Sequence, residues 1–123
     1  MNYKKDISMS HQFHSAFHAA PGKEGGVLNI GPAAISIDIQ NLRVFVAAMD
    51  QIEQRRASGE VREGVSHVEP HVIAESDWAQ IAYVVERNTH ALRYNGVAWE
   101  SPSDVTVAAT AEARFFLEGL TES

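Results

Sequence analysis

The chain has 123 residues, of which 45% are hydrophobic, and it carries 16 Asp and Glu against 10 Lys and Arg, a formal net charge of −6. That length is typical of one domain with its own core, and the absence of cysteine excludes disulfides, thiolate metal sites and cysteine nucleophiles. The acidic balance argues against nucleic acid or an anionic membrane as the main partner.

No apolar stretch in the sequence reaches the length of a secretion signal or of a membrane span. Acidic and basic residues are interleaved, as in the run from Glu53 to Glu63, and this pattern is typical of a solvated surface. We therefore expect a soluble protein in the cytoplasm, with neither a membrane nor a nucleic acid as its partner.

The N-terminal residues 1–21 are predicted to form an arm, either mobile or built into a first strand, that precedes a single α+β domain over 22–123. The turn-rich run Pro21–Gly26 is expected to be an exposed loop. Residues 7–18 fit two periodicities: their apolar side chains alternate as in a strand, yet several also fall at helical spacing. Strand and helix both stay open for this segment.

Strictly alternating isoleucines over residues 35–39 predict a strand, which would pair with residues 27–30 in a hairpin that turns at Gly31–Pro32. A helix is predicted over 41–57, because apolar residues recur there on one helical face. Asn41 is the expected N-cap of this helix.

Residues 59–70 are charged and turn-rich, and they are predicted to form a loop with a short edge strand over 65–68. A second helix is predicted over 77–88. Ser76 suits its N-cap, and apolar side chains recur at helical spacing from Trp78 onward.

Asn95–Gly96 predicts a tight turn. Because aromatic residues flank this pair, we favour a hairpin between 91–94 and 97–99 over a helix that ends there. A third helix is predicted over 103–120, with Ser103 as its N-cap. The elements together predict a compact α+β fold, in which three helices pack on a small, mostly antiparallel sheet.

The segment His67-Val68-Glu69-Pro70-His71 is the strongest candidate for metal chemistry. In an extended chain His67, Glu69 and His71 point the same way, and two imidazoles with a carboxylate are a common ligand set for zinc, with nickel as an alternative. Residues two apart on a strand are about 6.5–7 Å apart, so the outer pair would need a bend at Pro70. A polar loop without a metal is the simpler interpretation, and no cofactor is predicted.

A second histidine cluster near the N-terminus consists of His11, His14 and His18. On a helix, spacings of three and four residues would let neighbouring members share a metal ion. A strand would place them too far apart or on opposite faces. A metal site here therefore requires residues 9–20 to be helical.

The favoured hypothesis is a small acidic binding protein that acts through protein–protein contacts, with another protein or a second copy in a homodimer as partner. By compositional analogy, inhibitors and accessory proteins of phages, mobile gene cassettes and toxin–immunity pairs are of this kind. No nucleophile elbow or phosphate-binding loop occurs, so a non-enzymatic function is favoured and enzyme status stays open. The contact candidates are Arg93, Tyr94, Trp99, Phe115 and Phe116.

Two alternative functions are kept. One is a metal-binding protein or metal-dependent enzyme that uses His67, Glu69 and His71, joined by His90. The other is a domain that binds a small organic ligand in an apolar pocket lined by Trp78 or Tyr83.

Overall fold

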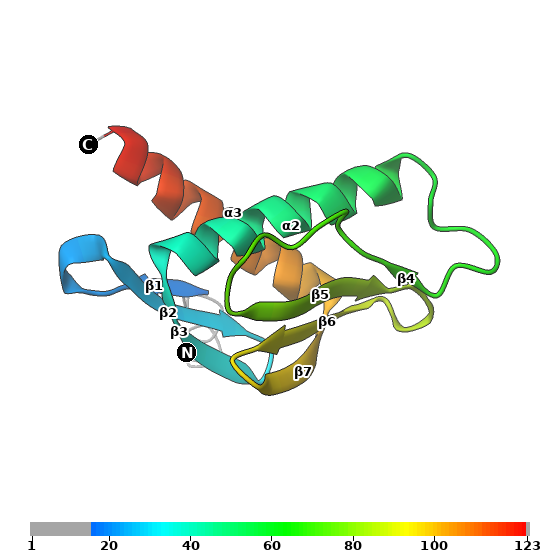
Figure 1. Cartoon of the computed structure of the whole chain (residues 1–123), viewed down its shortest axis with the longest axis horizontal. Coiled ribbons are helices and arrows are strands. Elements are labelled where there is room, and N and C mark those ends of the chain that lie inside the picture. Colours follow the sequence, from blue (N-terminus) through cyan, green and yellow to red (C-terminus); the bar gives the residue numbers. More distant parts are fainter. Residues whose placement is uncertain (1–15, 123) are drawn as a thin grey trace, which may run out of the picture.

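The computed structural model describes residues 16–122. Within this range seven strands and two long helices follow one another, with single-turn 3-10 helices at Pro21–Lys23 and Val85–Arg87. The elements are β1 (Phe17–Ala19), β2 (Gly25–Ile30), β3 (Ala33–Asp38), α2 (Ile39–Ala57), β4 (His67–Val68), β5 (Trp78–Val84), β6 (Thr89–Tyr94), β7 (Val97–Pro102) and α3 (Ser103–Glu122). The two helices lie along one side of the strands (Figure 1).

The strands form two antiparallel sheets with the orders β1-β2-β3 and β4-β5-β6-β7. Both predicted hairpins are confirmed, since Ile30 pairs with Ala33 and Tyr94 pairs with Val97. The turn of the second hairpin has φ of 50° at Asn95 and 82° at Gly96. These positive values are what the tightest hairpin turns require and what an Asn-Gly pair readily adopts.

β1, β2 and β3 approach one another closely at two glycines. A Cβ atom on Gly26 would lie 2.1 Å from the carbonyl oxygen of His18, and one on Gly25 would lie 2.4 Å from that of Ile37. Only glycine leaves room for these contacts. Both residues belong to β2, so the exposed loop predicted over Pro21–Gly26 ends before Gly25, which is buried.

The helices predicted over 41–57 and 103–120 are confirmed as α2 and α3. The N-cap of α2 is Asp38, whose Oδ1 accepts a hydrogen bond of 2.8 Å from the backbone N–H of Asn41. Asn41 was the predicted cap and is instead a buried residue of the first turn. In the described part of the chain, neither helix combines the length and the apolarity that a membrane span requires.

The helix predicted over 77–88 is wrong, because this segment forms β5 and a 3-10 turn. Residues 81–84 are all buried, and a strand covered on both faces shows a continuous apolar run that also satisfies helical spacing. The hydroxyl of Ser76 does accept a hydrogen bond, 3.1 Å from the backbone N–H of Trp78, but it does so where a strand begins.

A single hydrophobic core joins both sheets to both helices. At its centre the ring of Trp78 stacks on Phe45 of α2 at a centroid distance of 5.4 Å and tilts against Tyr94 of β6 at 4.6 Å. Trp99 of β7 donates from Nε1 to the carbonyl oxygen of Ile30, 3.1 Å away. This bond ties the second sheet to the end of β2.

Candidate functional site

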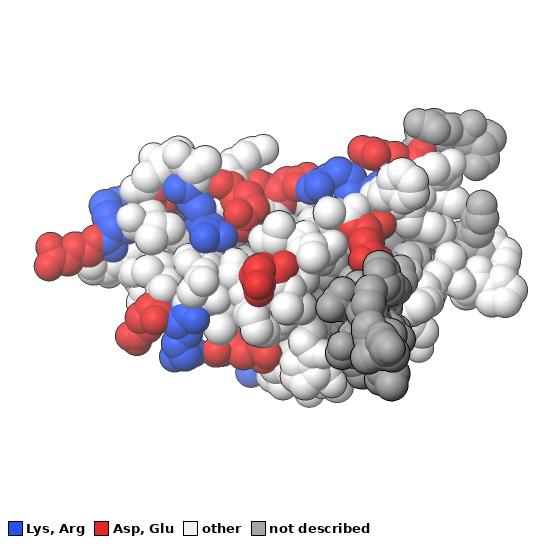
Figure 2. All heavy atoms as spheres, turned by 180° about the vertical axis from the view of Figure 1, so that it is seen from behind, with Lys and Arg blue, Asp and Glu red and all other residues white. Residues whose placement is uncertain are grey.

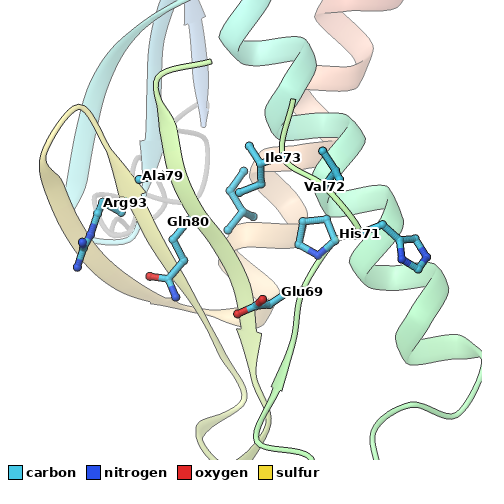
Figure 3. A pocket seen from close by; sticks show the side chains of 9 residues that line it. Glu69, His71, Val72, Ile73, Ala79, Gln80 and Arg93 are labelled. Carbon is cyan, nitrogen blue, oxygen red and sulfur yellow. The ribbon is translucent and has the colours of Figure 1, made fainter. Parts of the chain in front are cut away.

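The predicted metal ligands point in different directions. The Nδ1 atom of His67 lies 3.0 Å from the hydroxyl of Ser66, while that of His71 lies 3.4 Å from the guanidinium of Arg55. Figure 3 shows His71 directed away from Glu69. Among residues 16–122, no three His, Asp or Glu side chains are grouped so that they could hold a metal ion.

Of the N-terminal histidine cluster, only His18 belongs to the described residues; it is exposed on β1. His11 and His14 lie outside them, as do residues 7–15, for which strand and helix were both open. The described end of this segment is a strand, and the backbone N–H of Ala16 donates to a carboxylate oxygen of Glu112 on α3 at 2.7 Å.

His90 is buried completely, with its Nε2 atom 3.8 Å from a carboxylate oxygen of Glu53. Neither ring nitrogen has a hydrogen-bond partner in the described structure. Burial, together with the positive charge of Arg56, lowers the pKa of His90 to about 4, so the ring is neutral at neutral pH. It is therefore a core residue.

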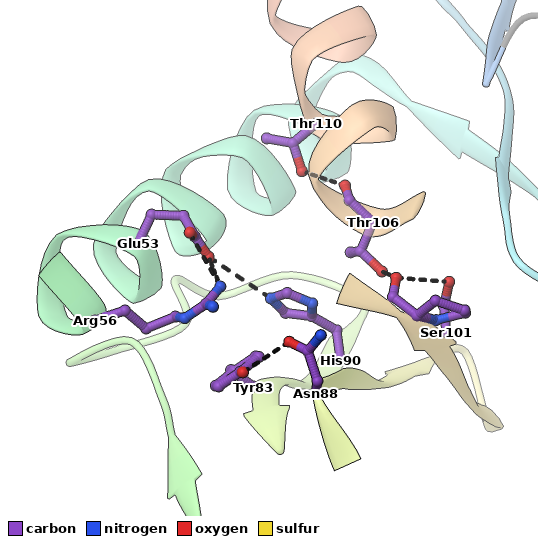
Figure 4. A network of polar contacts seen from close by, with 9 residues as sticks. Glu53, Arg56, Tyr83, Asn88, His90, Ser101, Thr106 and Thr110 are labelled. Atoms are coloured by element: carbon purple, nitrogen blue, oxygen red, sulfur yellow. Dashed lines mark hydrogen bonds and ion pairs between the residues drawn. The ribbon is translucent and has the colours of Figure 1, made fainter. Parts of the chain in front are cut away.

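The polar side chains around His90 form hydrogen bonds with other groups and none with its ring (Figure 4). Arg56 donates to Glu53 and places its guanidinium carbon 3.8 Å from the centre of the Tyr83 ring. The hydroxyl of Thr106 donates to the carbonyl of Pro102, and that of Thr110 donates to the carbonyl of Thr106. Nothing in the sequence around His90 signals this burial, which depends on both helices.

Three of the predicted contact residues lie on the β6–β7 hairpin. Arg93 is exposed, Trp99 is half-buried and Tyr94 is 4% exposed. Tyr94 and Trp99 mainly anchor the hairpin to the core, whereas Arg93 and Val97, the latter 52% exposed, reach solvent on opposite faces of its tip. Trp78, expected to line a pocket in the ligand-binding hypothesis, is 4% exposed and belongs to the core.

The other two contact candidates are neighbours on α3 with different surroundings. Phe115 is 79% exposed, the most exposed large hydrophobic side chain among the described residues. Phe116 is half-buried, with its ring 4.7 Å from that of Phe17. Adjacent helix positions point about 100° apart, which is why one ring packs on the core and the other does not.

Two grooves lie on either side of the hairpin end. The first has a volume of about 530 Å³ and runs between β5 and the chain after β4, with Glu69, Gln80 and Arg93 on its walls (Figure 3). The second, called the Asp38 groove below, has a volume of about 680 Å³. Its lining consists of His18, Ala19, Ala20, Pro21, Glu24, Gly25, Gly26, Val27, Ser36, Ile37, Asp38 and Tyr94.

The Asp38 groove combines a small-residue lining with uncompensated negative charge. Alanine and glycine from β1, β2 and the turn between them leave space, and Tyr94 reaches the groove from the other sheet. Neither Glu24 nor Asp38 forms an ion pair with Lys or Arg in the part of the chain that is described. By contrast, Glu53, Glu60 and Glu100 each pair with an arginine.

Buried Asn41, in the first turn of α2, is hydrogen-bonded to both Asp38 and Asp77. Asn41 donates from Nδ2 to a carboxylate oxygen of Asp77 at 3.0 Å and accepts from the backbone N–H of Asp77 at 2.9 Å. Burial raises the pKa of Tyr94, and the charges of Asp77 and Asp38 raise it further. These two carboxylates therefore create a negative potential at the Tyr94 end of the groove.

Elsewhere the surface charge is mixed. On the face seen in Figure 2, lysine and arginine side chains lie among the aspartate and glutamate side chains. This agrees with the interleaving expected from the sequence. Comparison of the chain with models of protein families, with curated proteins and with solved structures finds no match.

Proposed function

We propose that this chain is a binding protein that acts through protein–protein contacts, and that it offers its partner the tip of the β6–β7 hairpin and the adjoining Asp38 groove. The observation that carries the proposal is a concave surface where the two sheets meet, since a groove of about 680 Å³ is lined there by both sheets. Concave sites between structural units are where proteins commonly take ligands.

The hairpin tip is suited to this role because it is fixed before any partner arrives. Tyr94 packs on Trp78, and Trp99 is hydrogen-bonded to the carbonyl of Ile30, so the exposed Arg93 and Val97 stand on a rigid support. A surface that is already ordered loses less conformational entropy on binding. The acidic balance of the chain favours a partner with a basic or neutral surface, in a reducing cytoplasm.

The test compares partner capture by the wild-type chain with capture by Arg93→Gln and Val97→Gln, which add no charge that could attract a basic partner. Val61→Gln is the matched control, because Val61 is also an exposed valine, 39% accessible, and lies in the loop after α2. Co-purified proteins are measured by quantitative mass spectrometry, and sedimentation analysis detects a second copy as partner. Both hairpin variants should capture less of the partner, whereas the control should capture it as the wild type does. Equal capture by all four chains, with folding verified by circular dichroism, would refute the proposal.

A further inference from the structure

We propose that the Asp38 groove binds an extended, basic segment of the partner, with the main chain of that segment along the free edge of β3 and a Lys or Arg side chain between Glu24 and Asp38. This rests on the proposed protein-binding function and gives the chemistry of the segment that is recognised. Three properties of the groove lead to it: an unpaired strand edge, unpaired carboxylates and an apolar floor.

The first of these properties is the free edge of β3. β3 pairs with β2 on one side, and it has no strand on the other side in the described sheet. Ser36 and Asp38 of this strand line the groove. An edge strand presents unpaired backbone N–H and C=O groups, and an extended peptide can add to it as a further strand. The edge carries neither proline nor lysine, two residues that commonly block such pairing.

The charge of the groove selects a basic side chain. One carboxylate oxygen of Asp38 caps α2, and the other has no hydrogen-bond partner among the described residues. Glu24 in the β1–β2 turn lacks an ion-pair partner as well, and Asp77 adds a further negative charge close to Tyr94. A cation from the partner would be attracted to this end, and an acidic segment would be repelled.

The floor of the groove suits the aliphatic part of such a side chain. Val27 is 37% exposed and stands in a cross-strand row with His18 and Ser36. Lysine and arginine lay their methylene groups on apolar surface of this kind while the charged end reaches polar partners. An extended segment with Lys or Arg at alternate positions would place these side chains on one face, toward the floor.

The experiment uses the full chain and a capped hexapeptide in which lysine alternates with valine. A nuclear magnetic resonance titration should shift the backbone amide resonances of Val27, Ser36 and their neighbours. The titration is done at about 0.15 M salt, because exposed charges at longer range are largely screened under these conditions and distant surface charges then contribute little. The same peptide with glutamate in place of lysine should not bind. Two further versions carry N-methyl groups either on every lysine or on every valine. The version whose methylated amides face β3 cannot pair with the strand edge and should lose binding, whereas equal binding by both would contradict strand addition.

Two variants remove the groove charges without removing the fold. Asparagine caps a helix as well as aspartate does, so Asp38→Asn keeps the hydrogen bond to the first turn of α2. Asp38→Asn and Glu24→Gln should each weaken the lysine peptide about two- to fivefold, as expected for one exposed ion pair. Glu63→Gln, which neutralises an exposed acid in the loop after α2, should leave the affinity unchanged.

Several outcomes would overturn this assignment: no binding of the lysine peptide, equal binding of the glutamate peptide, or equal affinity in all three charge variants. These results are separable from the test of the proposed function. If the hairpin variants lose the cellular partner while the lysine peptide does not bind, the basic segment is refuted and the protein-binding function is retained. If the hairpin variants keep every partner, the proposed function fails whatever the peptide does.

Discussion

The imidazole of His90 lies 3.8 Å from the carboxylate of Glu53, yet neither of its ring nitrogens makes a hydrogen bond in the described structure. The titratable and charged groups around it are Glu53 and Arg56 on α2 and Tyr83 on β5, whose ring centre is 5.4 Å from that of His90. Its other neighbours are uncharged, because β7 and α3 contribute Ser101 and Thr106 to this cluster (Figure 4). The core therefore holds a neutral histidine beside an ion pair.

This arrangement predicts a loss of stability in mild acid. The pKa of His90 is about 4 in the folded chain against 6.5 for a free histidine, so the unfolded chain takes up a proton at a higher pH than the folded one. The contribution of neutral His90 is complete above about pH 6.5 and falls as the pH drops toward 4. Between about pH 7.5 and about pH 5 the free energy of unfolding should decrease by about 2 kcal/mol through this residue alone.

Urea denaturation at the two pH values measures this loss. His90→Leu has no titrating ring, so the difference between wild type and variant isolates the histidine from the carboxylates that also titrate. The variant should lose about 2 kcal/mol less than the wild type over the same interval. An identical loss in both chains would show that the ring is not kept neutral by its surroundings.

The second prediction compares the effects on stability of substituting Asn41 and its neighbour Gln40 on α2. Asn41→Ala removes both hydrogen bonds to Asp77 and leaves polar groups of a part-buried junction unpaired, so it should cost about 2–3 kcal/mol of unfolding free energy. Gln40→Ala, one position earlier on the exposed side of the helix, should change stability by less than about 0.5 kcal/mol. The measurement is the thermal unfolding midpoint of each variant, and similar midpoints would contradict the role given to Asn41.

The local signals in the sequence predicted the turns and two helices well. Gly31–Pro32 and Asn95–Gly96 define hairpins through their own backbone preferences, and α2 and α3 each have one apolar face. The strand β5 is not predicted from the sequence, because the spacing of apolar residues in a strand depends on whether one face or both faces are buried. In β5 both faces are buried over residues 81–84. A single sequence does not show that coverage.

The candidate site was harder to predict than the fold, because its parts are distant in the chain. Asn41 looked like a helix cap, whereas its decisive partner, Asp77, is 36 residues further on. The Asp38 groove joins the β1–β2 turn to Tyr94 of the other sheet, and no short motif encodes that meeting. Tyr94 is a predicted contact residue, yet it is 4% exposed, because it packs on Trp78 in the core.

The glycines of β2 give a third prediction. Gly26→Ala would place a Cβ atom 2.1 Å from the carbonyl oxygen of His18, a backbone atom that cannot turn away, so β1 should separate from β2. Hydrogen exchange of the amides of β1 and β2 should become fast. Gly22→Ala is the control: its added Cβ meets nothing within 4 Å, and only the strain of a φ of 85° remains, about 1 kcal/mol. Protected β1 amides in Gly26→Ala would contradict the close approach.

The two phenylalanines of α3 are expected to differ in their effect on stability, because Phe116 packs on the core and Phe115 lies at the surface. Phe116 contacts the ring of Phe17, so Phe116→Ser should lower the free energy of unfolding by about 1–3 kcal/mol. Phe115 is 79% exposed, and Phe115→Ser should therefore leave stability within about 0.5 kcal/mol of the wild type. If Phe115 belongs to a contact between copies, the same substitution should shift the sedimentation profile toward the monomer at high protein concentration. An unchanged profile would remove Phe115 from the contact residues and leave the hairpin end as the binding surface, because the two surfaces are on different elements.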